Sequence, residues 1–214
     1  MKSSKIIFLF ACLIFVCQLT KAQTDSAQYK KTYLSLSSAL REPEKVYRLN
    51  LSNLPIDSFP IDLSKFKNLE YLCLNNDHIE FIPRSVCDLT NLKVLELNGD
   101  DFKTLPPEFS QLINLQELYL NVNKNIDLAK SINVLSTLPK LSILHLENDG
   151  ISTLPPNLTK LTHLEKLYLN NNKISVVPTQ FNSMKNLKYV EMQNNQIPPY
   201  KMNDNKGFGV KIKF

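Results

Sequence analysis

The sequence predicts an α/β solenoid of seven stacked repeats, with a parallel β-sheet on the concave side and extended and 3-10 segments on the convex side. Two observations predict this fold. A pattern of the form Leu-x-x-Leu-x-Leu returns at intervals of 23 residues with one exception, and most return segments carry a pattern close to Leu-Pro-x-x-Leu. A unit of this length can bury its apolar face only by stacking on a copy of itself. The period therefore decides the fold class.

The seven units align on their first aliphatic residue, with intervals of 23 residues and a single interval of 26. They begin at Val46, Leu69, Leu92, Leu115, Leu141, Leu164 and Leu187. Within each unit, apolar residues at positions 4 and 6 flank an outward residue, as in a strand that buries one face. We expect one short strand per unit, paired in parallel with neighbours about 4.8 Å away.

The return segments place proline beside an aliphatic residue, as in the pair at 154–155. Proline lacks an N–H donor and has a fixed φ, so these legs cannot form a second hydrogen-bonded sheet. The fourth unit lacks this proline and is three residues longer. There Asp127 can cap a helix whose apolar face is Leu128, Ile132 and Leu135. We expect one convex helix, either as a neutral insertion or as a specialised contact site.

Both ends of a solenoid need a cap, because each end exposes a layer of the core. Residues 23–45 are expected to form a leader and a short N-terminal capping helix, the helix over 35–40. The repeats would occupy 46–200. The tail 201–214 ends in alternating apolar and polar residues, which predicts a half-buried cap strand; a secretion tag is the alternative for this tail.

The repeat resembles the leucine-rich repeat family over about residues 46–197. The unit at Leu164 reads Leu-Glu-Lys-Leu-Tyr-Leu-Asn-Asn-Asn-Lys-Ile, close to the family motif Leu-x-x-Leu-x-Leu-x-x-Asn-x-Leu. The return leg is similar to that of bacterial members and of the Ras-associated intracellular group. The resemblance implies a curved, right-handed solenoid.

Position 9 of the unit is where family members place a ladder asparagine, whose amide can satisfy backbone groups of adjoining turns. In this chain the expected structural ladder mixes amides and acids. Its residues are Asp77, Asp100, Asn123, Asp149, Asn172 and Asn195. Ionised aspartates only accept hydrogen bonds, and Asp77 and Asp100 should lie about one strand spacing apart, where like charges disfavour joint ionisation. We expect at least one of these two to pair with an exposed cation, take up water or titrate above an ordinary aspartate. The alternatives are simple acceptance from nearby N–H groups and a calcium site.

The first 22 residues are predicted to be a secretory signal peptide cut after Ala22. Lysines near the start precede an apolar run over 6–16, and small residues precede the cut. The run is shorter than the roughly 20 residues of a membrane-spanning helix. An uncleaved anchor is the alternative, and Cys12 and Cys17 lack a good lipoprotein-processing signal. We interpret the leader as bacterial and expect a secreted, periplasmic or cell-surface protein.

The net charge outside the leader is small. The leader holds three of the 25 basic residues and none of the 20 acidic ones, which leaves the remainder at +2. Bulk charge therefore does not predict nucleic-acid binding, and we expect no nucleic-acid partner. Cys73 is expected on the outer strand surface and Cys87 on the opposite leg. A disulfide needs Cα atoms within about 7 Å, so we expect two unpaired thiols.

No catalytic motif is present in the sequence, whether a zinc-protease helix, a nucleophile elbow or a phosphate-binding glycine loop. His78 and His163 are most simply solvated turn residues. The sequence therefore predicts no enzyme, no catalytic residue, no metal site and no cofactor.

Strand positions 3 and 5 face outward on the concave side and carry several aromatic residues. The candidate ligand-binding residues are Tyr71, Glu96, Tyr119, His145, Tyr168 and Tyr189. Tyrosine offers a large contact area with a polar end and is enriched in interface cores, so we expect a protein or peptide ligand there. Ordinary strand surface is the alternative, because tyrosine also favours strands. An intracellular signalling scaffold and a structural cell-envelope protein are the alternative functions, with membrane contact only by surface association.

Overall fold

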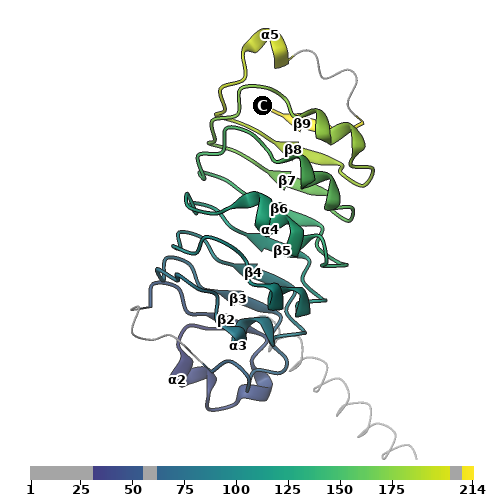
Figure 1. Ribbon diagram of the computed structural model, residues 1–214. Helices are drawn as coiled ribbons and strands as arrows, with labels where there is room; N and C mark the ends of the chain where they lie inside the picture. Colours follow the sequence, from purple (N-terminus) through teal and green to yellow (C-terminus); the bar gives the residue numbers. More distant parts are fainter. Residues whose placement is uncertain (1–30, 55–61, 203–208) are drawn as a thin grey trace, which may run out of the picture.

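The computed structural model describes residues 31–54, 62–202 and 209–214. These residues form an elongated stack of turns along one parallel β-sheet, with the helical segments on the opposite side of the stack (Figure 1). The sheet has nine strands in sequence order, so each turn pairs only with its neighbours. The predicted signal peptide lies outside the described residues.

The strands are short, and their bounds repeat with the period of the sequence. They are β1 Thr32–Tyr33, β2 Arg48–Asn50, β3 Tyr71–Cys73, β4 Val94–Glu96, β5 Glu117–Tyr119, β6 Ile143–His145, β7 Lys166–Tyr168, β8 Tyr189–Glu191 and β9 Lys211–Lys213. Strands β2 to β8 occupy positions 3 to 5 of the seven predicted units. Leu118 pairs with Leu144 in register although 26 residues separate them. The predicted α/β solenoid with a parallel sheet is confirmed.

The convex legs are mostly 3-10 turns, as the prolines predict, but the structure contains one more α-helical segment than expected. The segments are α3 Arg84–Cys87, η3 Pro107–Gln111, α4 Leu128–Leu135, η4 Pro156–Lys160 and η5 Thr179–Ser183. The expectation of a single convex helix is wrong, because the N–H of Asp88 donates to the carbonyl of Arg84 and closes an α-turn there. An α-turn and a 3-10 turn differ by one such hydrogen bond, so one convex leg can contain an α-turn where other legs contain 3-10 turns.

The helix α4 follows its sequence signal closely. The carboxylate of Asp127 accepts a hydrogen bond of 3.0 Å from the N–H of Lys130, which caps the helix. Leu128, Ile132 and Leu135 are buried, as the spacing predicts. The three extra residues of the fourth unit therefore widen one convex leg while the sheet register stays intact.

The core runs the length of the stack between the sheet and the convex legs. The central residue of each strand from β2 to β8 is fully buried: Leu49, Leu72, Leu95, Leu118, Leu144, Leu167 and Val190. Phe109 and Phe181 fill the space behind them from the convex legs. Burying one such side chain contributes roughly 1.5–3 kcal/mol, so repetition of the layer stabilises the whole stack.

Each end of the described stack carries an edge strand outside the seven units. At the N-terminal end, β1 pairs with β2, and helix α2 Leu36–Ala39 and the turn η1 Pro43–Lys45 connect the two strands. Ser35 caps α2 by accepting from the N–H of Ser38 at 3.3 Å. At the C-terminal end, α5 Pro199–Met202 precedes β9, and Ile212 and Phe214 pack partly buried against the core. The strand β1 has no counterpart in the expected N-terminal cap.

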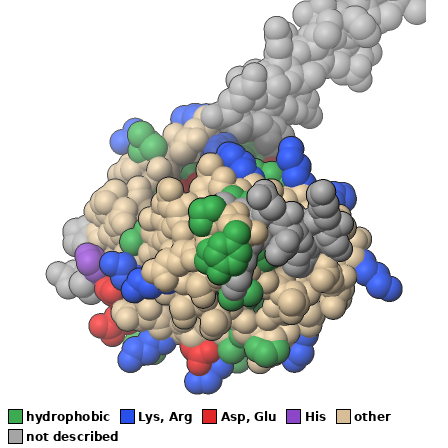
Figure 2. Space-filling view, turned by 90° about the horizontal axis from the view of Figure 1, so that it is seen from above, with side chains coloured by type: hydrophobic (Ala, Val, Ile, Leu, Met, Phe, Trp, Pro, Cys, Tyr) green, Lys and Arg blue, Asp and Glu red, His purple; other side chains and the backbone are tan. Residues whose placement is uncertain are grey.

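Two surface properties bear on function. In the end view of Figure 2, lysine and arginine side chains are dispersed around the outline and do not form one patch. No helix within the described ranges is both long and apolar enough to cross a bilayer.

Candidate functional site

The concave side carries a row of rings from four adjacent strands, Tyr119, His145, Tyr168 and Tyr189, which we call the aromatic row. The His145 ring stacks on Tyr119, with centroids 3.9 Å apart and planes within 9°. On its other face it stacks on Tyr168 at 4.3 Å and 2°. Tyr189 continues the row at 5.9 Å with a tilt of 60°. In-register parallel pairing puts equal positions about 4.8 Å apart, which is why Tyr119, His145 and Tyr168 can stack, whereas Tyr189 lies two positions earlier on its strand.

One glutamate is hydrogen-bonded to the imidazole of His145, and a second lies close to it. Glu117 Oε1 lies 3.0 Å from His145 Nε2 and accepts the hydroxyl of Tyr119 at 2.8 Å. Glu147 Oε2 lies 3.8 Å from His145 Nδ1. His145 is only 8% exposed, so it supports its neighbours more than it offers a contact surface. Sequence reasoning missed both glutamates as site residues.

Tyr71 and Glu96 form a second, separate cluster. The hydroxyl of Tyr71 donates to Glu96 Oε1 at 2.7 Å, and Asn75 donates to the other oxygen at 2.8 Å. The guanidinium of Arg48 lies over the Tyr71 ring, 3.9 Å from its centroid. Val94 on β4 interrupts the aromatic residues between Tyr71 and the row. The six predicted ligand-binding residues thus divide into four in the row and two beside it.

The hydroxyls of Tyr71 and Tyr119 are held as neutral donors. Burial, followed by the hydrogen bond to Glu96, raises the pKa of Tyr71 well above its usual range. Burial and the hydrogen bond to Glu117 do the same to the pKa of Tyr119. Both phenols therefore remain protonated under physiological conditions, and the hydrogen bonds to the glutamates persist.

Cys73 differs from its predicted position on the outer surface. It lies at an outward strand position, yet it is only 2% exposed. Asn50 and Glu96 are its register partners on the two neighbouring strands, so β2 and β4 enclose it. Burial raises the pKa of the Cys73 thiol to about 11 and that of Cys87 to about 12. Both thiols are free, as predicted.

The six predicted ladder residues form one column along the edge of the sheet, which we call the ladder. A side-chain oxygen of each rung accepts a hydrogen bond from the backbone of the preceding turn. The donors and acceptors are Leu54 to Asp77, Asp77 to Asp100, Asp100 to Asn123, Asn123 to Asp149, Asp149 to Asn172 and Ile174 to Asn195, at 2.6–3.1 Å. The ladder therefore ties successive turns together.

A second amide column runs beside the ladder at position 7. Asn75 Oδ1 accepts the N–H of Asn98 at 2.9 Å, and Asn98 Oδ1 accepts that of Asn121 at 2.8 Å. The pattern continues from Asn121 to Glu147 and from Asn170 to Gln193. These asparagines therefore join neighbouring units.

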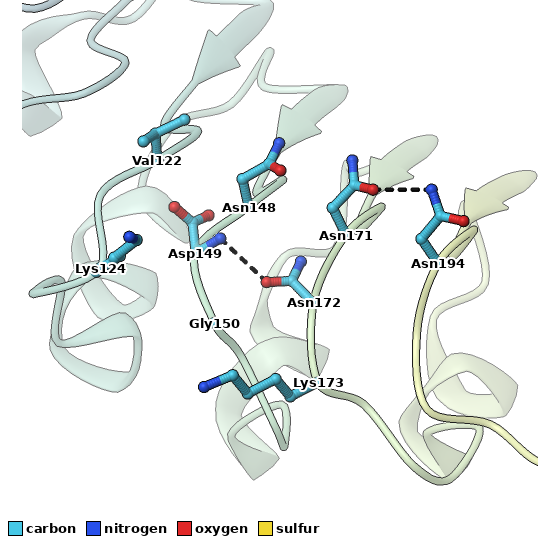
Figure 3. Close-up of a pocket in the computed structure, with 9 residues that line it drawn as sticks. All are labelled: Val122, Lys124, Asn148, Asp149, Gly150, Asn171, Asn172, Lys173 and Asn194. Carbon is cyan, nitrogen blue, oxygen red and sulfur yellow. Dashed lines mark hydrogen bonds between the residues drawn. The ribbon is translucent and has the colours of Figure 1, made fainter.

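An open groove lies where the turns of the later units leave the sheet (Figure 3). Asn148, Asn171 and Asn194 line it at positive φ angles of 63°, 58° and 57°. Asn194 donates to Asn171 at 2.8 Å. Asparagine tolerates this left-handed backbone better than most residues. The turn conformation therefore accounts for these asparagines, and the concave clusters remain the better candidate for a ligand site.

Within the described residues, no group of three or more histidine, cysteine, aspartate or glutamate side chains is placed to hold a metal ion. The chemistry that the concave side offers is hydrogen bonding, charge and apolar contact. Such a surface suits recognition.

The fold and the concave clusters define a repeat solenoid with an ordered, largely polar–aromatic sheet face. Residues 139–197 match the family model described as leucine rich repeat. The described residues therefore form a leucine-rich-repeat solenoid. No curated protein matches its sequence.

Three solved structures share the fold. A leucine-rich-repeat protein of Leptospira interrogans has a TM-score of 0.60 at 23% identity, covering 85% of this chain and 57% of its own. The Drosophila Toll–Spatzle complex has a TM-score of 0.62 at 22% identity, and the match covers 78% of this chain and 24% of that one. The TLR13–ssRNA13 complex has a TM-score of 0.65 at 23% identity, and the match covers 79% of this chain and 27% of that one.

The likeness to these structures is one of fold, and the chain spans little more than half of the Leptospira protein and about a quarter of the other two. One neighbour is a complex with a protein and another is a complex with RNA. The fold is thus compatible with a protein partner, and it gives no support to the expectation that nucleic acid is excluded.

Proposed function

We propose that this chain is a non-catalytic recognition module, secreted or displayed at the cell surface, that binds a protein or peptide along its concave face. The observation that carries the proposal is the stacked aromatic row. Its rings are held by their neighbours and by Glu117 and Glu147 before any ligand arrives. Rigid aromatic anchors lose little conformational entropy on binding, which favours affinity.

The row carries charges of both signs. Glu117, Glu147 and Glu191 lie along it, and only Glu191 has a lysine partner, Lys213 at 2.8 Å, among the ion pairs of the described residues. Nucleic-acid binding depends on lysine and arginine contacts to phosphates. Lys166 and Lys211 are the register partners of Tyr189 on the same face, so acidic and basic groups lie side by side and RNA serves as the competing ligand in the test.

The test compares the chain from residue 23 onward with its Tyr119→Ala/Tyr168→Ala variant. Affinity capture and mass spectrometry identify a partner, whose affinity is then measured for both proteins. We expect the double variant to bind at least roughly tenfold more weakly, since a central anchor is worth more than about 1.4 kcal/mol. Phe81→Ala, which alters a side chain that is 83% exposed and outside the row, is the matched control. Equal affinity of wild type and double variant would move the site elsewhere.

Secretion has a separate test. The full chain is expressed in a bacterial host, and the mass of the mature protein is measured in the medium and the cell envelope. A mature form that begins at Gln23 is expected. Recovery of the uncleaved chain in the soluble cytosol would instead favour the intracellular scaffold.

A further inference from the structure

The ladder contains a chemical inconsistency that points to protonation. Asn172 and Asp100 make the same backbone contacts through Oδ1. Asn172 accepts from the N–H groups of Asp149 and Ile151 at 3.1 and 3.0 Å. Asp100 accepts from those of Asp77 and Ile79 at 3.0 and 3.3 Å. The second atom of each side chain, Nδ2 or Oδ2, therefore occupies the same place in the repeat.

That second atom is a donor in the amides. Nδ2 of Asn123 donates to the carbonyl of Leu97 at 2.7 Å, and Nδ2 of Asn172 donates to that of Leu146 at 2.7 Å. Asn195 donates in the same way to Leu169 at 2.8 Å. The receiving carbonyl belongs each time to position 6 of the preceding unit.

In the acids the second atom, Oδ2, faces no hydrogen-bond donor. Oδ2 of Asp77, Asp100 and Asp149 is buried and has no hydrogen-bond partner among the described residues. These side chains are 1%, 4% and 7% exposed. The repeat register directs each Oδ2 toward a carbonyl equivalent to those that the amides contact. An ionised oxygen would face that carbonyl with no donor between them, which is costly when both are buried.

We propose that Asp77, Asp100 and Asp149 are held in the folded protein as neutral carboxylic acids, whose Oδ2–H replaces the amide donor of the ladder. The three acids then make the stability of the solenoid sensitive to pH. While protonated, the three aspartates donate a hydrogen bond as the ladder asparagines do. When they ionise, that hydrogen bond between adjacent turns is lost. This inference is independent of what the concave face binds.

The electrostatic surroundings agree with this assignment. Burial is the largest cause that raises the pKa of Asp100 and of Asp149, each to about 7. The backbone N–H groups that each carboxyl accepts from lower its pKa, while the charge of Asp101 raises that of Asp100 and the charge of Glu147 raises that of Asp149. Burial also raises the pKa of Asp77.

Cations nearby do not pair with the three acids. His78, next to Asp77, lowers the pKa of that acid slightly but makes its contact with Asp101 at 3.0 Å. Lys124 and Lys173 line the groove beside Asp149 (Figure 3). None of the ion pairs among the described residues includes Asp77, Asp100 or Asp149.

The direction of the pH effect follows from linkage. An unfolded aspartate has a pKa of about 3.9, below that of the buried rungs, so the folded state binds these protons more tightly. The stabilisation from the protonated rungs is complete below about pH 4 and is lost as the pH rises toward about 7. Most proteins lose stability in acid because their paired carboxylates become protonated; these rungs act in the opposite direction.

The test compares urea unfolding of the wild type and of an Asp100→Asn/Asp149→Asn variant, at about pH 5 and about pH 8. We expect the urea concentration at the wild-type unfolding midpoint to be lower at about pH 8 than at about pH 5. The variant carries permanent amide donors, so its midpoint should change less and exceed that of the wild type at the higher pH. Asp88→Asn, an exposed acid outside the ladder, is the control and should follow the wild type.

Parallel pH profiles for wild type and double variant would overturn the proposal. A second measurement covers the case in which the variant does not fold. Carbon-13 NMR of the wild-type side-chain carboxyls should show Asp100 and Asp149 titrating near 7. Titration of both at ordinary aspartate values would also refute the assignment.

Discussion

The imidazole of His145 lies flat on the ring of Tyr119, with centroids 3.9 Å apart and planes within 9°. The two residues are 26 positions apart, across the one irregular interval of the repeat, and yet they pair in register on β5 and β6. The three extra residues are absorbed by the convex helix α4. The aromatic row is therefore continuous through the point where the sequence is least regular.

Replacement of His145 by alanine should destabilise the fold. The change removes two stacked pairs and the contact with Glu117. Each aromatic pair contributes about 0.5–1.5 kcal/mol beyond buried area, so we expect a loss of about 1–3 kcal/mol in urea unfolding. His163→Ala, at an exposed turn position, provides the control. Equal losses for the two variants would show that the stack contributes nothing to stability.

Asn172→Ala should be one of the most damaging single changes in the ladder. The side chain satisfies two N–H groups and the carbonyls of Leu146 and Leu169. Each buried group left unpaired costs about 1–3 kcal/mol, and water will satisfy some of them, so we expect a loss of about 3 kcal/mol. Asn186→Ala removes one exposed hydrogen bond, to Thr162, and should cost less than about 1 kcal/mol. A similar loss for both would contradict a structural ladder.

Asn172→Asp should transfer pH sensitivity to a rung that lacks it. The new carboxyl would meet the same buried carbonyls, so its folded-state pKa should rise above the unfolded value of about 3.9. Stability should then approach the wild-type value at about pH 4–5 and decline as the pH rises. The measurement is the difference in unfolding free energy between variant and wild type across this range. A difference that does not depend on pH would count against protonated rungs.

The two thiols should be unreactive in the folded protein. Burial raises the pKa of Cys73 to about 11 and that of Cys87 to about 12, and the thiolate is the reactive form. In the chain from residue 23 onward, a disulfide reagent at about pH 8 should modify neither thiol until urea is added, and then both. A Cys87→Ser variant assigns the remaining thiol. Rapid modification of Cys73 in the native state would show that β2 and β4 do not enclose it.

Two glycines should tolerate alanine to different degrees. Gly99 and Gly150 have φ angles of 71° and 74°, which disfavour any side chain, so each alanine variant should lose about 1 kcal/mol or more. An added Cβ on Gly99 would also meet the side-chain oxygen of Asn76, whereas at Gly150 it would meet nothing. We therefore expect Gly99→Ala to lose more stability than Gly150→Ala in urea unfolding. The reverse order would show that the Asn76 side chain moves aside without cost.

The candidate site was predictable in its positions but not in its environments. The outward strand positions identify Tyr119, His145 and Tyr168 from the period alone. Their stacking, and the burial of Cys73, depend on side chains about 23 residues away on both flanking strands. A repeat pattern states which residues become neighbours, but it does not state which of them cover one another. Glu117 and Glu147 were missed for this reason.

The sequence by itself determined the architecture of this protein: the strand of each unit, the proline-directed convex legs, the helix of the fourth unit and the residues of the ladder. It could do so because a short unit with one apolar face has a single way to bury that face, by stacking in register. Only the tertiary structure decided which polar side chains lost their water. The burial of Asp77, Asp100 and Asp149 among backbone groups of adjoining turns sets their protonation, because desolvation depends on every neighbour at once.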